Sequence, residues 1–414
     1  MSDFLFNKIC IIGVGLIGGS LGLSLRKNHV ARHIVGLARS QETIDRAIEL
    51  GIIDEGSITP LTAVENADII VLCSPLGTYK KIIDLIEVHL KEGAIITDAG
   101  SVKQLPTEEV LGALQQERRE FFIPAHPIAG TEKSGPEAAF DSLYEGKLCI
   151  ITPTPIANQD ALLKVRKMWE EVGSKVVEMP LRKHDMIYAA VSHNIQLLSS
   201  AFGLAFLKCD WPIRGEIINK PDSHFKQFIR LAGSDAVMWR DIFIENRQNI
   251  NLSLERFLVN INSLREQISS GEEDVLEERL QSAHEKRMLL RNMHRANVKR
   301  DDEVNYSSFG AKSLPWVSLL PRLISCAVME GISDGEYDFA DGAGLHGFTR
   351  NILLNDALQK EDIFANKVKL LTAIDSFIGE VLELRSAMVG GDASALEDLL
   401  SQARECYLQI NACG

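Results

Sequence analysis

Two short polar blocks carry residue types suited to hydride chemistry on an alcohol. The first is Asp98–Lys103 (DAGSVK) and the second is His126–Gly135 (HPIAGTEKSG). Oxidation of a carbinol needs a base that takes or shares the hydroxyl proton, and histidine suits this role because its ordinary pKa lies near neutrality. A lone histidine is more often structural, but one in a glycine-bounded loop beside a serine loop favours catalysis. We predict His126 as the base, with Ser101 hydrogen-bonded to the histidine or to the hydroxyl.

A glycine-rich segment near the start of the chain predicts a dinucleotide site. The segment GVGLIG (residues 13–18) follows an apolar run and precedes a helical pattern. Its three glycines would permit a tight turn, close approach of a pyrophosphate, and packing of the helix on the strand. The helix N-terminus would add N–H groups and partial positive charge for the phosphates. The predicted cofactor-binding residues are Gly13, Gly15, Leu16, Ile17 and Gly18, with Ser74 and Asp98 at the ends of later strands.

The end of the second predicted strand bears on the choice of cofactor. This segment, GLARS (residues 36–40), has no carboxylate to bind the ribose 2′-hydroxyl of NAD. Arg39 and Ser40 stand where they could meet the 2′-phosphate of NADP. We therefore expect NAD(P)+ as cofactor, with NADP+ accepted. The alternative is that Arg39 is an ordinary solvated arginine.

The elements that must position these residues alternate along the first 180 residues. Apolar strand patterns alternate with helical ones, which predicts a parallel sheet covered by helices, a Rossmann-type α/β domain. After His184 only helical patterns follow, so an all-α region comes second. The predicted strands are residues 8–15, 33–38, 68–75, 94–100 and 120–127, with 147–155 and 175–180 continuing the same sheet.

The helical region contains a repeat. A shift of 120 residues places Phe257 on Phe377 and Leu264-Arg265 on Leu384-Arg385, and a shift of 126 aligns an earlier segment. A nearly constant register over about 90 residues indicates a duplicated helical domain. The predicted domains are 1–180 (dinucleotide-binding), 181–287 (helical), 288–312 (linker) and 313–414 (degenerate second helical copy).

Composition limits the classes of function. The net charge of −13 over 414 residues argues against a nucleic-acid or anionic-membrane surface. The seven cysteines are scattered without metal-ligand spacing, so we expect reduced thiols, a cytoplasmic protein and no metal site. The uncharged stretch from Ile9 to Leu25 contains five glycines, which favours a buried strand and turn over a signal or membrane segment.

Taken together, the motifs resemble those of prephenate dehydrogenases, also called cyclohexadienyl dehydrogenases. The resemblance rests on GVGLIGGSL, DAGSVK, HPIAGTEKSG, the His184-Asp185 pair and MWRDIF, and it covers about residues 7–287. It implies oxidative decarboxylation of prephenate to 4-hydroxyphenylpyruvate, or of arogenate to tyrosine, in tyrosine biosynthesis.

The same resemblance implies a set of substrate-binding residues. Arg230 matches the family's substrate-carboxylate arginine, Lys226 is a second candidate cation, and Glu132 resembles a residue that lines the entrance of the site. The planar guanidinium of arginine suits a carboxylate better than an ammonium group does.

One helical motif departs from the family pattern. Ser-His-Leu-Pro-His is usual, whereas this chain has His193 followed three residues later by Gln196, and we predict that both contact the substrate. Gln227 also replaces an aspartate found in several relatives. These departures leave the choice of substrate open.

The assembly and two rival functions also remain open. The family's helical domain joins two subunits, so either a homodimer or an intramolecular pseudo-dimer is expected, and the second copy has Leu319 and Arg322 where histidines stand in relatives. A β-hydroxyacid dehydrogenase with a catalytic lysine is one rival. A catalytically silent, nucleotide-binding relative is the other, motivated by Gln196 and Gln227.

Overall fold

The chain forms two compact units, which we describe separately. A computed structural model describes residues 4–412, except 132, 211–213, 216–222, 294–314, 334–335, 337–344, 350–351 and 353–359. The units are Met1–Met186 and Ile187–Gly414, so the division lies six residues beyond the end of the predicted first domain.

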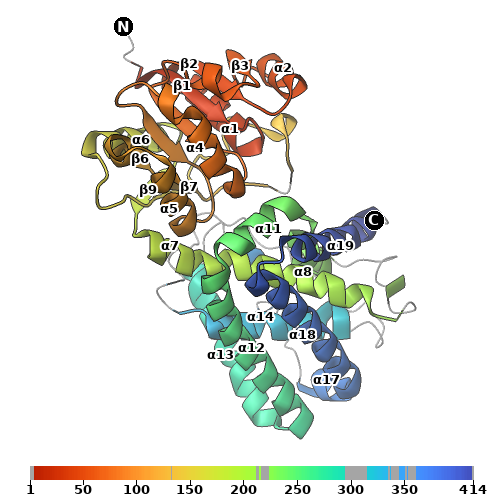
Figure 1. The fold of residues 1–414 in the computed structure, drawn as a ribbon. Helices are drawn as coiled ribbons and strands as arrows, with labels where there is room; N and C mark the ends of the chain where they lie inside the picture. Colours follow the sequence, from red (N-terminus) through yellow and green to blue (C-terminus); the bar gives the residue numbers. More distant parts are fainter. Residues whose placement is uncertain are drawn as a thin grey trace. The chain divides into compact units, whose positions relative to one another are not determined.

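The first unit is built on a six-stranded parallel sheet (Figure 1). Its strand order, β3-β2-β1-β4-β5-β6, is that of dinucleotide-binding folds, and ligands of such sheets bind outside the carboxyl ends of β1 and β4. All four residues of β4 and of β5 are buried, because helices cover both faces of the sheet. The strands are β1 (Phe6–Ile12), β2 (Ala31–Leu37), β3 (Glu55–Ser57), β4 (Ile69–Leu72), β5 (Ile95–Asp98) and β6 (Phe122–Ile123).

Helices and short 3₁₀ turns connect these strands. The sequence patterns predicted this alternation, although the short, polar β3 was not among the expected strands. The helices are α1 (Leu16–Lys27), α2 (Gln41–Glu49), α3 (Pro60–Val64), α4 (Tyr79–Ile86), α5 (Gln104–Ala113), α6 (Gln159–Glu171) and α7 (Leu181–Tyr188). The 3₁₀ turns are η1 (Leu76–Thr78), η2 (Glu87–His89), η3 (Gln116–Phe121) and η4 (Pro136–Ala138).

The last strands of the first unit correct one prediction. They were expected to extend the large sheet, but they form a separate three-stranded sheet, in which β7 pairs antiparallel with β8 and β8 parallel with β9. Pro124 separates β6 from β7, and since proline has no N–H group it cannot continue the strand ladder. The strands are β7 (Ala125–Pro127), β8 (Leu148–Ile151) and β9 (Lys175–Glu178).

The second unit is entirely helical in its described residues. Its elements are η5 (Ala189–His193), α8 (Asn194–Leu207), α10 (Ser223–Ile229), η6 (Arg230–Gly233), α11 (Ala236–Glu245), α12 (Arg247–Ser270), α13 (Glu273–Met293), η8 (Pro315–Leu319), α14 (Leu320–Gly331), α16 (Leu345–Phe348), α17 (Lys360–Ala365), α18 (Lys367–Gly390) and α19 (Ala393–Ala412). The predicted linker 288–312 begins inside α13, and its residues from 294 onward lie outside the described residues.

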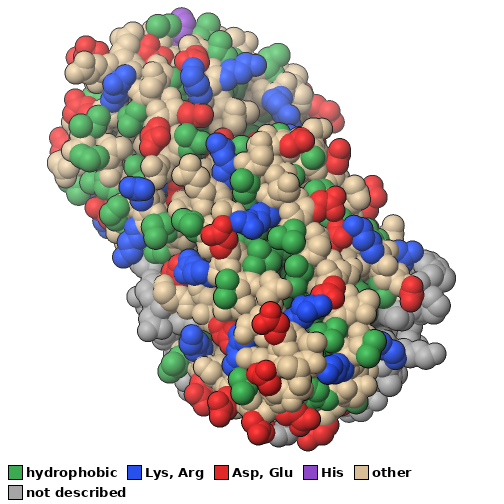
Figure 2. Space-filling model, turned by 60° about the horizontal axis from the view of Figure 1, so that its bottom comes forward, with side chains coloured by type: hydrophobic (Ala, Val, Ile, Leu, Met, Phe, Trp, Pro, Cys, Tyr) green, Lys and Arg blue, Asp and Glu red, His purple; other side chains and the backbone are tan. Residues whose placement is uncertain are grey.

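Two features bear on the predictions that the chain has no membrane segment and no nucleic-acid surface: one long apolar helix, and the distribution of surface charge. Among the described residues, Leu181–Leu207 alone is long and apolar enough to cross a membrane, but 89% of its most apolar window is buried inside the protein, as in a core helix. Figure 2 shows Lys and Arg side chains interspersed with Asp and Glu over the face in view, without a continuous basic patch on it.

Candidate active site

The turn after β1 has the backbone geometry that the glycine motif predicts. Gly13 has a positive φ of 99°, and a Cβ added there would lie 2.7 Å from the carbonyl oxygen of Cys73. A Cβ on Gly18 would lie 2.0 Å from the carbonyl oxygen of Gly13 and 2.8 Å from Ile11. Both positions therefore require glycine, because any side chain would push α1 away from β1 and β4.

The N-terminus of α1 fits a bound pyrophosphate. Gly15 is the N-cap residue of this 12-residue helix, so no side chain caps its first N–H groups, and its first turn carries no acidic residue. No atom lies within 4 Å of the place where a Cβ of Gly15 would be. Open space beside uncapped N–H groups is what a phosphate requires. Leu16 is buried in the first turn, and the carbonyl of Ile17 accepts a hydrogen bond from the hydroxyl of Tyr144 at 2.6 Å.

The remaining predicted cofactor residues lie at the carboxyl ends of the strands. Arg39 is exposed directly after β2. Ser40 is the N-cap of α2, where its side chain accepts a hydrogen bond from the backbone N–H of Thr43 at 3.3 Å. Ser74 is half-buried after β4 and accepts a hydrogen bond from the hydroxyl of Thr78 at 2.9 Å.

Asp98, the last predicted cofactor contact, has several partners within the protein. Its carboxylate is 1% exposed and forms an ion pair with Lys103, which is equally buried. It also accepts hydrogen bonds from the backbone N–H groups of Gly100 (2.8 Å) and Ala125 (3.1 Å). Buried charges persist only when they are paired in this way. Asp98 therefore ties the end of β5 to β7, and its contact with the cofactor stays a prediction.

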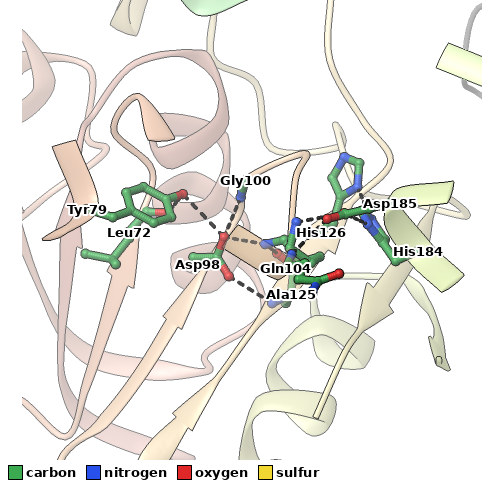
Figure 3. A network of polar contacts seen from close by, with 10 residues as sticks. Leu72, Tyr79, Asp98, Gly100, Gln104, Ala125, His126, His184 and Asp185 are labelled. Carbon is green, nitrogen blue, oxygen red and sulfur yellow. Dashed lines mark hydrogen bonds and ion pairs between the residues drawn. The ribbon is translucent and has the colours of Figure 1, made fainter. Parts of the chain in front are cut away.

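A chain of hydrogen bonds links His126 to His184 and Asp185, which we call the His–His–Asp relay (Figure 3). Nδ1 of His126, on β7, lies 2.8 Å from Nε2 of His184, on α7. Nδ1 of His184 in turn lies 2.8 Å from Oδ1 of Asp185. Asp185 also accepts hydrogen bonds from the backbone N–H groups of Lys103 and Gln104, both at 2.8 Å. The relay is therefore anchored to the loop that follows β5.

Burial and hydrogen bonding set the charge states within the relay. Burial lowers the pKa of His184, against the opposing effect of Asp185, so the imidazole is neutral at physiological pH. Burial acts to raise the pKa of Asp185, but the hydrogen bonds from His184 and the two backbone N–H groups outweigh it. The pKa of Asp185 is therefore lowered, and its carboxylate stays ionised.

These charge states determine the tautomers along the relay. An ionised Asp185 only accepts, so a neutral His184 donates from Nδ1 and accepts at Nε2. His126 then donates from Nδ1, which leaves Nε2 of a neutral His126 without a proton. This is the form that can take a proton from a hydroxyl group, and the same logic orients the histidine of a serine protease.

Two other residues of the first unit, Ser101 and Glu132, were predicted to belong to the site. Ser101 is half-buried in the loop between β5 and α5, two residues before Lys103. Glu132 lies outside the described residues. The relay itself was missed by sequence reasoning, which noted the His184-Asp185 pair only as part of the family resemblance.

In the second unit, two side chains of α8 hold the turn that carries Arg230. Gln196 donates from Nε2 to the carbonyl of Leu231 at 2.7 Å. Ser199, one helical turn on, donates to the carbonyl of Phe228 at 3.0 Å and accepts from the backbone N–H of Ala232 at 3.2 Å. Arg230 itself is half-buried at the start of η6.

The other residues of this unit that the sequence singled out are His193, Lys226 and Gln227. His193 is 1% exposed, with Nδ1 3.0 Å from the side-chain nitrogen of Asn246 and its ring edge against Trp239. Lys226 is half-buried on α10, and the side chain of Gln227 lies outside the described residues. Among the described parts of the chain, no group of three or more His, Cys, Asp or Glu side chains could hold a metal ion.

Two family models match consecutive parts of the chain. Residues 21–178 match the nucleotide-binding domain of prephenate dehydrogenase, and residues 180–282 match its dimerization domain. The two matches meet close to the division between the compact units and end at residue 282.

Individual relatives agree with these matches. The cyclohexadienyl dehydrogenase of Zymomonas mobilis is 30% identical over 291 residues, which are 70% of this chain and 98% of that protein. A prephenate dehydrogenase from Aquifex aeolicus, crystallised with hydroxyphenyl propionate and NAD+, is 37% identical with a TM-score of 0.64, over 69% of this chain and 98% of that one. An arogenate dehydrogenase from Synechocystis is 29% identical with a TM-score of 0.55, over 66% of this chain and 96% of that one.

Proposed function

The chain belongs to the prephenate dehydrogenase family, and from this premise we propose that it oxidatively decarboxylates prephenate or arogenate with NAD(P)+. The His–His–Asp relay is the observation that carries the proposal. It places an oriented imidazole on β7, in the same unit as a glycine turn that fits a dinucleotide.

His126 takes or shares the proton of the substrate's hydroxyl group. When bound, the oxidised nicotinamide accepts the hydride that leaves the carbinol carbon. The carbon–carboxylate bond then breaks with release of carbon dioxide, and its electron pair moves through the ring to the ketone oxygen. The resulting phenolate takes back the proton from His126 and becomes a phenol. Positive charge that develops on His126 is stabilised by the hydrogen bond that it donates to His184 and, through His184, by the Asp185 carboxylate. Ser101 orients the hydroxyl or the histidine.

The helical unit supplies the groups that bind the anionic substrate. Arg230 binds a carboxylate through its planar guanidinium, and Gln196 and Ser199 hold the turn on which it sits. Lys226 provides a second positive charge. His193 and Glu132 complete the predicted contacts, as the family resemblance implies.

Gln196 bears on the choice between the two substrates. Its Nε2 is engaged by Leu231, while its Oε1 is buried and has no hydrogen-bond partner among the described residues. An unpaired acceptor favours a ligand that donates. The ammonium group of arogenate donates hydrogen bonds, whereas the keto group of prephenate only accepts them. We therefore propose that Gln196 favours arogenate.

The cofactor choice is proposed from the end of β2. Arg39 is exposed there, and the segment GLARS (residues 36–40) contains no carboxylate to bind the ribose 2′-hydroxyl, which favours acceptance of a 2′-phosphate. We propose that the enzyme accepts NADP+ as well as NAD+. Arg39→Ala should then lower kcat/KM for NADP+ much more than for NAD+. Arg32→Ala, at an exposed arginine within β2, serves as the control.

The rival functions are weaker. Catalysis by a lysine, as a β-hydroxyacid dehydrogenase would require, is disfavoured at Lys103, which is 1% exposed and bound to Asp98 and to the carbonyl of Ala125. A silent relative would not need an oriented imidazole. The proposed setting is the cytoplasm, with a small-molecule substrate and no nucleic-acid or membrane partner, consistent with the net charge of −13.

The test is the reduction of NAD+ and of NADP+ by the purified protein, with prephenate and with arogenate in separate reactions. Turnover with either substrate, with carbon dioxide released in equal amount, is expected. Binding of the nucleotide without turnover of either substrate would favour the silent relative. Turnover of a simple β-hydroxyacid instead would favour the other rival.

A further inference from the structure

The two halves of the helical unit contain the same long helix. Helices α12 and α18 each have 24 residues and begin 120 residues apart. Each follows an asparagine N-cap, Asn246 with φ −108° and Asn366 with φ −109°. Each ends at a left-handed glycine, Gly271 with φ 81° and Gly391 with φ 72°. Matching lengths and matching caps at both ends indicate the same local fold.

A rare feature and a buried hydrogen bond also recur. A single turn of π-helix occurs in each half, at η5 (Ala189–His193) and 126 residues later at η8 (Pro315–Leu319). Such turns form well under 1% of protein structure. On the helices that follow, the hydroxyl of Ser199 donates to the carbonyl of Phe228 at 3.0 Å. In the second half, Ser325 donates to the carbonyl of Phe348 at 3.1 Å.

The contacts between the halves join equivalent residues. Phe228 stacks on Phe348 with ring centroids 4.2 Å apart, and Phe257 meets Phe377 edge to face at 6.2 Å. In each pair the residue numbers differ by 120. A residue that contacts its own counterpart lies on the twofold axis of a self-complementary interface.

Contacts away from this axis come in equivalent pairs, in which the two halves of the helical unit exchange roles. Arg265 forms an ion pair with Asp375, and Arg385 forms one with Glu255 at 2.7 Å. A shift of 120 residues converts the first pair into the second. The helix contacts show the same reciprocity. Helix α12 of the first half packs on α14 of the second, and the equivalent α18 of the second half packs on α8 of the first (Figure 1). These ion pairs and helix contacts of one half on the other thus have reciprocal counterparts.

We propose that residues 315–412 are a built-in second subunit, so that the family's dimer interface is closed within one chain. The part that matches the dimerization domain ends at residue 282, and the chain from residue 315 onward covers its self-complementary face. Relatives matched over 98% of their length leave about 30% of this chain unmatched, which is enough for one extra helical half.

The second half also supports the substrate-binding turn. A Cβ added to Gly233, three residues after Arg230, would lie 2.2 Å from the ring of Tyr407 on α19, so the aromatic ring packs directly on this turn. Glu397, on the same helix, forms an ion pair with Arg240 of α11. The second half has Leu319 and Arg322 at the positions of His193 and Gln196. It therefore serves as packing partner for a single substrate-binding half.

The decisive experiment tests the exchanged ion pairs in one chain and between chains. Arg385→Glu and Glu255→Arg each bring like charges together and should lower the melting temperature by about 2–4 °C. The double variant restores an ion pair within one chain and should recover most of this loss. Lys369→Glu reverses an exposed charge on α18 and controls for net charge.

The two single variants are then co-expressed with different tags and purified together. If the interface lies within each chain, every chain keeps its own repulsive pair, and the melting temperature stays low. If the halves pair between chains, a mixed dimer regains both ion pairs and the stability returns, which overturns the proposal. Single variants as stable as the wild type, or a double variant without recovery, would equally overturn it.

Dilution gives an independent readout on the unaltered enzyme. Turnover per chain should stay constant from micromolar to nanomolar concentration, with the mass of one 45.9 kDa chain at the lowest concentrations. A fall in turnover that tracks dissociation of a two-chain particle would contradict a built-in partner.

Discussion

Replacing Asp185 by asparagine tests whether the His–His–Asp relay assists proton transfer. Asparagine keeps the size of the side chain but removes the negative charge. With its oxygen toward His184 and Lys103, its amide nitrogen would face the N–H of Gln104, where Asp185 now accepts at 2.8 Å. The variant thus loses one backbone hydrogen bond and the charge that favours a protonated His126.

The magnitude follows from the contacts that change. A hydrogen bond to a charged group is worth about 1.5–3 kcal/mol. Because each 1.36 kcal/mol is tenfold in rate, kcat should fall by about 10- to 150-fold. The effect should be smaller than that of losing His126, since Asp185 acts through His184. KM for the substrate and the Kd of the cofactor should change little, because neither group binds Asp185 in the proposed mechanism.

Steady-state reduction of NAD+ over a range of pH gives kcat, and nucleotide titration gives the cofactor Kd. The acid limb of the kcat profile should also move to lower pH in the variant, a change that a merely structural role would not produce. Asp84→Asn is the matched control, because Asp84 pairs with Lys80 on the exposed face of α4. A folded Asp185→Asn enzyme with kcat within about twofold of the wild type would refute the relay.

Three further predictions address the base, the substrate carboxylate and stability. His126→Asn should lower kcat by about 10²–10⁴-fold with cofactor affinity unchanged, and near-normal turnover would remove His126 from the mechanism. Arg230→Ala should chiefly raise KM, by about 10- to 150-fold, because a carboxylate contact acts already in the ground state; an unchanged KM would place the carboxylate elsewhere. The lowered pKa of His184 means that the unfolded chain takes up a proton first as pH falls below 6.5, so stability should be full above this pH and decline below it. Denaturant titrations at several pH values measure the slope of the free energy of unfolding against pH, which is at most about 1.4 kcal/mol per pH unit for one proton. His184→Gln should flatten this slope. An equal slope in the variant would show that other groups titrate.

The fold class could be predicted because its signals are local. Buried parallel strands are continuous apolar runs, and the turn at Gly13 requires a glycine at a fixed position after the first of them. The strand Glu55–Ser57 carries no such signal, because it is short and polar. The separate sheet of β7 to β9 depends on the interruption at Pro124, and the number of sheets was not evident from apolar runs alone.

The site was only partly predictable, because its key contacts join distant segments. His126 was identified by its loop, but its partner His184 is 58 residues away, and no periodicity shows that their rings meet. Asp98 was predicted as a cofactor contact because it ends a strand, and only the fold reveals its buried ion pair with Lys103. Gln196 was predicted as a substrate contact, and its hydrogen bond to the carbonyl of Leu231, the residue after Arg230, became visible only in three dimensions.

The edge-to-face contact of Phe257 with Phe377 has a consequence for how this protein can evolve. In a dimer of identical chains, one codon encodes the residue on both sides of the twofold axis. A mutation there therefore changes both side chains at once, and the new side chain must pack against its own copy. In the proposed tandem arrangement two codons supply the two sides, and each can change alone. Glu255 and Asp375 already differ at equivalent positions. One reading frame can thus encode two unlike halves, one with Leu319 at the position where the other has His193.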